Sequence, residues 1–95
     1  MFVDMYRVSC VNQRMAEDIA LTLGRIQDGF RGTDGCSGQR LLRELKHHES
    51  FIVVSYWRDK ESLANASVPH AAIDEALDHL EIETVANAYE IIHEL

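Results

Sequence analysis

Basic residues are scarce in this chain. Lys and Arg number 9 against 16 Asp and Glu, which gives a formal net charge of -7 at pH 7. A nucleic-acid partner requires a surplus of Lys and Arg on one surface for phosphate contacts, and no basic run is present. The composition therefore predicts no nucleic-acid partner, and it disfavours binding to acidic membrane surfaces for the same reason.

Long apolar runs are also missing. No stretch approaches the ~20 apolar residues that a membrane span needs. The N-terminus Met1-Phe2-Val3-Asp4 has no basic segment followed by an apolar block, which a signal peptide would show. We therefore expect no membrane partner and a cytoplasmic protein. At 95 residues, of which 46% are hydrophobic and 26% charged, we expect one folded domain over residues 1–95.

Cysteine is sparse, and no cofactor motif is present. Cys10 and Cys36 form no CxxC pair and no cluster with His at metal-ligand spacing. The predicted topology places them on strands that are not neighbours, so we expect free thiols. The glycines between Gly29 and Gly38 lack the dinucleotide and phosphate-loop patterns. The sequence predicts neither a metal nor another cofactor.

A succession of strand and helix patterns is clearly present. Alternation predicts strands at 2–10, 36–45, 51–57 and 82–92, and helical spacing of apolar residues predicts a helix at 12–30. Asp59 is a predicted N-cap for a second helix. We expect that helix in two pieces, because Pro69 disturbs a continuous helix and Ser67 can cap a new one. The buried face of its second piece is predicted to comprise Ile73, Ala76, Leu77 and Leu80.

The order strand, helix, strand, strand, helix, strand predicts a ferredoxin-like α+β fold. Right-handed crossovers give a βαββαβ antiparallel sheet with the first and third strands central and both helices on one face. The strand at 51–57 is apolar on both faces, and the first and last strands also carry apolar residues on both. The face away from the helices therefore needs a cover, and we expect a second copy of the chain to supply it in a homodimer.

The segments GCSGQRLL and SYWRDKESLANASVPH resemble the antibiotic biosynthesis monooxygenase family, small proteins that dimerise into an α+β barrel. The resemblance implies a cofactor-independent monooxygenase. Its partners would be O2 and a small aromatic or quinol substrate in a cleft between sheet and helices. An alternative is a protein that binds haem or another apolar molecule without turnover. A structural dimer with a filled cleft is a third possibility.

His70 is the candidate catalytic residue. It lies near a predicted helix start, and Asp74, four residues on, is placed to orient the imidazole. A histidine so placed can act as general base on a phenol or enol. The alternative is a partly exposed histidine that only packs at a helix end.

Four residues are candidates for substrate binding: Tyr6, Trp57, Asn65 and Tyr89. The two tyrosines line a pocket if they face the helices, and otherwise are ordinary core residues. Trp57 either stacks on a planar ligand or closes the barrel end or the dimer interface. Asn65 either contacts the substrate or belongs to a solvated helix face.

Overall fold

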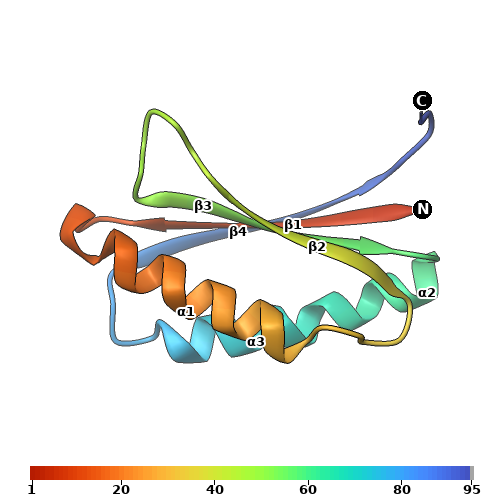
Figure 1. Ribbon diagram of the computed structural model, residues 1–95, viewed down its shortest axis with the longest axis horizontal. Helices are drawn as coiled ribbons and strands as arrows, with labels where there is room; N and C mark the ends of the chain where they lie inside the picture. The colour runs from red at the N-terminus through yellow and green to blue at the C-terminus, as the bar shows by residue number, and fades with distance from the viewer. Residues whose placement is uncertain (95) are drawn as a thin grey trace.

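The computed structural model describes residues 1–94, and its elements follow the predicted order (Figure 1). The strands are β1 (Phe2–Cys10), β2 (Cys36–Arg43), β3 (Ser50–Trp57) and β4 (Ile82–Glu90), and the α-helices are α1 (Ala16–Gly29), α2 (Lys60–Leu63) and α3 (Ser67–Ala76). Short 3-10 helices at Gln13–Met15 and Ala64–Ala66 precede α1 and α3. All strand pairs are antiparallel in the order β2-β3-β1-β4. Figure 1 shows the helices under one face of the sheet, which confirms the predicted fold class.

The register of the central strands decides which side chains face the helices. Tyr6 of β1 stands opposite Val53 of β3 and Ala86 of β4. Directly opposite residues point to the same face and successive residues alternate. Since Tyr6 and Val53 belong to the core, the even-numbered residues of β1 face the helices.

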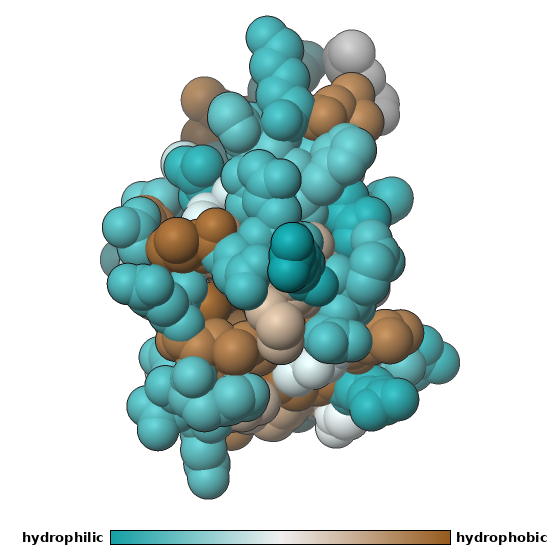
Figure 2. Space-filling model, turned by 90° about the vertical axis from the view of Figure 1, so that its left-hand side faces the viewer, coloured by the Kyte–Doolittle hydropathy of each residue, from teal (hydrophilic) through white to brown (hydrophobic). Residues whose placement is uncertain are grey.

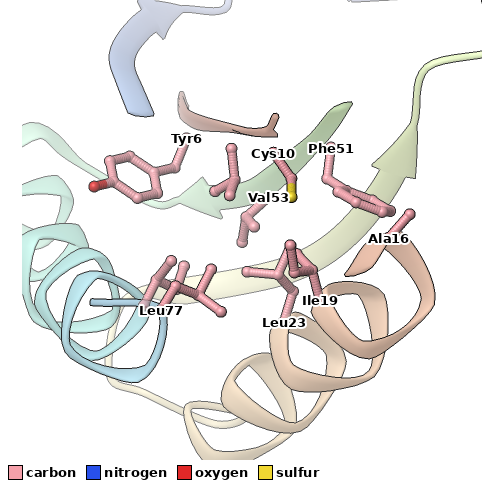
Figure 3. Packing of buried hydrophobic residues seen from close by; sticks show 10 residues of the cluster. Tyr6, Cys10, Ala16, Ile19, Leu23, Phe51, Val53 and Leu77 are labelled. Carbon is pink, nitrogen blue, oxygen red and sulfur yellow. The ribbon is translucent and has the colours of Figure 1, made fainter. Parts of the chain in front are cut away.

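The core lies between the sheet and the two long helices (Figure 3). Ile19 and Leu23 of α1 and Ile73 of α3 are completely buried, because their helical spacing turns them toward the sheet. Phe51 reaches down from β3 to meet α1 (Figure 3). Burying each side chain of this size contributes about 1.5–3 kcal/mol, so these contacts dominate the stability of the fold.

The second helical region begins where expected but is interrupted earlier. Asp59 caps α2, since its Oδ1 accepts from the Ser62 backbone N–H at 2.7 Å. The interruption is the 3-10 helix at Ala64–Ala66, and Ser67 is not a cap: its hydroxyl donates to the Ala64 carbonyl at 3.0 Å. Pro69 lies in the first turn of α3, where its lack of an N–H is tolerated. The prediction that Pro69 causes the break is therefore wrong.

The predicted burial pattern of α3 holds in part. Ile73 and Leu77 are buried and Leu80 is half-buried, but Ala76 is exposed. The helix is short and only one narrow stripe of it meets the sheet, so a residue three positions after Ile73 already lies outside the contact.

The outer face of the sheet carries apolar side chains without a helix over them. Leu42, Val85 and Tyr89 are 45%, 51% and 52% exposed, while Val3 and Val54 are buried by their neighbours on the same face. Figure 2 shows one end of the molecule, where hydrophilic residues dominate and apolar side chains form patches between them. Among residues 1–94, no helix is long and apolar enough to cross a membrane.

Candidate functional site

His70 and Asp4 form a close pair beneath the sheet. His70 Nε2 lies 2.5 Å from Asp4 Oδ2, although the two residues are 66 positions apart. Asp4 comes from the helix-facing side of β1, and His70 is the fourth residue of α3. Their side chains are only 8% and 18% exposed, so little water competes for this contact. A buried carboxylate is stable only with such a partner.

Tyr6 packs against the face of the same imidazole. Its ring stacks on the His70 ring with a centroid separation of 4.1 Å and an interplanar angle of 11°. The Tyr6 hydroxyl donates a hydrogen bond to Asp74, the carboxylate that the sequence assigned to His70. Burial, followed by this hydrogen bond, raises the pKa of Tyr6 above its ordinary value, so the phenol stays a donor. The assignment of Asp74 as the partner of His70 is thus corrected to Asp4.

The pairing decides which imidazole nitrogen is available for chemistry. An ionised Asp4 only accepts hydrogen bonds, so Nε2 carries the hydrogen and Nδ1 keeps its lone pair. In the described chain, every buried side-chain nitrogen and oxygen has a hydrogen-bond partner. Within residues 1–94, Nδ1 of His70 has no such partner, so it is not one of the buried atoms. Nδ1 is therefore accessible to small molecules. Neutral His70 is an oriented base with a free lone pair.

A largely enclosed cavity lies next to the pair, between α1, α3 and the sheet. Asp4, His70 and Trp57 contribute to its wall, and the rest is mainly apolar, including Ile26, Phe30, Val53, Pro69 and Ile73. Its free volume is about 20 Å³, which is room for about one water molecule. An aromatic molecule therefore enters only when wall side chains move, and haem is far too large for this state.

Solved structures with the same architecture support a fold assignment. A Deinococcus radiodurans protein classed with the antibiotic biosynthesis monooxygenases shares 19% identity at a TM-score of 0.86, covering 100% of this chain and 96% of that one. SnoaB from Streptomyces nogalater, described as a cofactor-independent oxygenase, shares 17% identity at a TM-score of 0.80, covering 99% and 95%. The chain has the fold of the antibiotic biosynthesis monooxygenases. This confirms the resemblance seen in the sequence.

Other solved structures with this fold have no assigned function. A Bacteroides thetaiotaomicron protein of unknown function also matches, with 15% identity, a TM-score of 0.75 and coverage of 95% and 97%. No family model matches the sequence. The search of curated proteins gave no match either. At these identities the comparisons establish the fold, and the chemistry must be argued from the site.

The predicted substrate-binding residues lie in different places on the monooxygenase fold. Trp57 is in the cavity wall, with its indole N–H donating to Ser55 Oγ at 2.8 Å. Tyr6 covers the imidazole but is outside the cavity lining. Asn65 is exposed on the 3-10 helix, and Tyr89 stands opposite Val3 on the outer face. Neither residue lines this cavity. Asn65 is exposed to solvent, and Tyr89 lies on the face of the sheet away from the helices.

Asp4 is the residue that sequence reasoning missed. Its signal was present: it is the one acid among the helix-facing residues of β1, between Phe2 and Tyr6. An acid at such a position is costly unless a partner meets it from the helix layer. Gln27 and Gln39 also line the cavity and were not singled out. Within the described chain, no group of three or more His, Cys, Asp or Glu is arranged to hold a metal ion.

Proposed function

We propose that this protein is a cofactor-independent monooxygenase that acts on a small phenol or quinol, with His70 as the general base. The proposal is carried by one observation: a histidine with a free Nδ1, oriented by Asp4, contributes to the wall of a largely enclosed and mainly apolar cavity. SnoaB, with the same fold, is described as a cofactor-independent oxygenase, which supports the reaction class.

The chemistry requires little beyond a positioned base. His70 Nδ1 takes the hydroxyl proton of the phenol, and the resulting phenolate is electron-rich enough to reduce O2. A ring carbon forms a bond to one oxygen atom, and the hydroperoxide then loses water to give a quinone. Phenol and O2 thus give quinone and water, with one atom of O2 in each product. Proton transfer by a positioned group contributes about 10²- to 10⁴-fold to such a rate.

The residues around His70 orient the base, offer a surface for the substrate and exclude water. Asp4 orients the ring and stabilises the imidazolium that forms when Nδ1 takes a proton. Trp57 offers a flat apolar surface against which an aromatic substrate can stack. The apolar wall excludes water, which strengthens the attraction between imidazolium and phenolate.

The outer sheet face supports a homodimer as part of this proposal. Leu42, Val85 and Tyr89 lie on it with about half of their surface exposed. A symmetric contact through the same face of two copies buries these side chains without leaving a strand face open. We propose that the functional unit is this dimer.

The decisive experiment replaces the base while keeping its hydrogen bond to Asp4. His70→Gln retains an amide donor for Asp4 but cannot take a proton at neutral pH. We expect the wild type to consume O2 with 1,4-naphthoquinol, or another quinol it accepts, and to place one atom of ¹⁸O₂ in the product. His70→Gln should lose this activity by about 10²-fold or more.

His79→Ala is the matched control, because His79 is exposed beyond the end of α3. It should keep full activity. Quinol oxidation at the wild-type rate in a folded His70→Gln variant would remove His70 from the mechanism. If the wild type oxidises no phenol or quinol above the rate in buffer, the proposed activity is wrong.

A further inference from the structure

The His70 cavity adjoins a second, open depression of about 320 Å³ at the edge of β2. Three residues belong to the walls of both: Gln27 of α1 and Cys36 and Gln39 of β2. These side chains are therefore the partition between the open depression and the enclosed cavity. Beyond them the lining changes character, because the depression is formed by Asp28, Arg31, Gly32, Ser37 and Gly38.

The partition depends on few interactions. Gln27 Nε2 donates to the Arg40 carbonyl at 2.7 Å, which ties the end of α1 to β2. A single neutral hydrogen bond in a solvent-exposed position has a small net free energy, since water replaces it readily. Displacing the Gln27 side chain requires no rearrangement of the helix or the strand.

The charge of the depression is already balanced. Arg31 Nη2 lies 2.9 Å from Asp28 Oδ1, so the guanidinium has a carboxylate partner. The Gln39 amide and the side-chain carbonyl oxygen of Gln27 are neutral hydrogen-bonding groups in the lining, whereas the Ser37 hydroxyl already donates to the Tyr56 carbonyl at 3.4 Å. A ligand group placed here meets neutral donors and acceptors beside an exposed ion pair that carries no net charge.

We propose that the depression is the outer half of the ligand site and that Gln27 and Gln39 gate the passage to His70. The matching ligand is elongated: a planar apolar end lies against Trp57, and a neutral hydrogen-bonding end, such as a carboxamide or hydroxyl, lies in the depression. The nature of the inner end rests on the proposed function, whereas the passage itself does not.

Trp57 provides a direct test of the passage, because it is the only tryptophan of the chain and lies in the inner wall. Acrylamide quenching of its fluorescence measures access to the cavity. Gln27→Ala should raise the quenching constant by about twofold or more, because local opening exposes a buried group. Gln13→Ala, which removes an exposed glutamine from the 3-10 helix before α1, should leave it unchanged.

Blocking the passage should have the opposite effect. Cys36 is half-buried in the partition and Cys10 is buried in the core, so N-ethylmaleimide should label Cys36 alone, as mass spectrometry can verify. The labelled protein should show less quenching of Trp57 than the unlabelled one. Equal quenching in wild type, Gln27→Ala and labelled protein would overturn the proposed route.

The ligand's polar end is tested by calorimetric titration with 2-naphthol and 6-hydroxy-2-naphthamide. We expect the amide to bind about tenfold more tightly, because it adds hydrogen bonds in the depression. In Gln39→Leu this ratio of affinities should fall toward one. Equal affinities of the wild type for the two compounds would contradict the assignment.

The titration measures binding without turnover. Amide-selective binding without O2 consumption would thus refute the activity alone, whereas oxidation without amide selectivity would refute the outer subsite alone.

Discussion

At the scale of single residues, the imidazole of His70 is held by two neighbours on one strand. Asp4 meets its edge and Tyr6 its face, and both side chains point from β1 toward the helices. Successive residues of a strand alternate, so only positions two apart can act together on one group in this way. The alternation of β1 thus places a carboxylate and an aromatic ring on the same histidine.

Asp4→Asn tests the orienting carboxylate. The variant keeps the shape of the side chain but removes the negative charge that stabilises a protonated His70. We expect turnover to fall by about 10²-fold or more with little change in KM, because the charge matters most when the proton moves. Steady-state O2 uptake measures this, with Asp78→Asn, an exposed position, as the control. Unchanged turnover would show that Asp4 serves packing only.

Tyr6→Phe isolates the hydroxyl, since the ring remains available to stack on His70. The pKa of Tyr6 is raised above 10.0, so its folded environment favours the neutral phenol. That stabilisation is fully present below about pH 10 and is lost as pH rises through the raised pKa. Urea unfolding should find Tyr6→Phe less stable by about 0.5–1.5 kcal/mol at pH 7. The difference should shrink above pH 10.

Thr22→Val provides the comparison for that experiment, because it removes a hydroxyl that donates to the Asp18 carbonyl within α1 and does not titrate. Its difference in stability from the wild type should stay the same from pH 7 to 11. A difference between wild type and Tyr6→Phe that stays constant from pH 7 to 11 would contradict the stated role of the Tyr6–Asp74 hydrogen bond.

The sequence predicted His70 but misassigned its partner for a definite reason. Spacing along a helix connects only residues three or four apart, and it therefore offered Asp74. The actual partner depends on which face of β1 meets α3, a relation between elements 66 residues apart. Tyr89 was misplaced for a similar reason: its face follows from the β1–β4 register, which alternation within one strand does not fix.

At the scale of elements, local patterns predicted most of the fold. Strand alternation and helical periodicity are set by backbone geometry, so they gave β1, β3 and the end of α1 to within one residue, whereas α1 begins at Ala16 after a 3-10 helix. The helix interruption was misplaced because a proline is disruptive in a helix interior but tolerated in a first turn, and Pro69 has the second position. The presence of a proline in a helical segment does not by itself tell whether it lies in the interior or in the first turn.

The cap of α2 gives a pH-dependent prediction. Hydrogen bonding from Ser62, chiefly its backbone N–H, lowers the pKa of Asp59 below 3.8. The resulting stabilisation is present above that pH and is lost as pH falls through the lowered pKa. Asp59→Asn keeps a capping oxygen without a titrating group, so thermal melting should show a weaker acid dependence than in the wild type. Asp59→Ala should melt lower than both at neutral pH, and equal melting of all three would contradict the cap.

At the scale of the whole molecule, the uncovered sheet face predicts self-association. Tyr89→Asp places a charge on that face, opposite Val3 and at a position that is half exposed in one copy. We expect the wild type to sediment as a dimer at low micromolar concentration and Tyr89→Asp as a monomer, because an unpaired charge in an apolar contact is costly. Leu21→Asp, at an exposed position on α1, should remain dimeric. A wild type that sediments at 10.8 kDa would contradict this prediction.

The pairing of β1 has a consequence for how the protein is made. β1 is synthesised first, yet its neighbours in the sheet are β3 and β4, which leave the ribosome after it, β4 last of all the elements. Until Glu90 has emerged, the edge of β1 that pairs with β4 stays open. A nascent chain stalled after Leu80 already contains Asp4, Tyr6 and His70. It lacks β4, so β1, which carries Asp4 and Tyr6, has no partner along its second edge. The strand that carries Asp4 and Tyr6 is therefore paired along both edges only when translation of the last strand is complete.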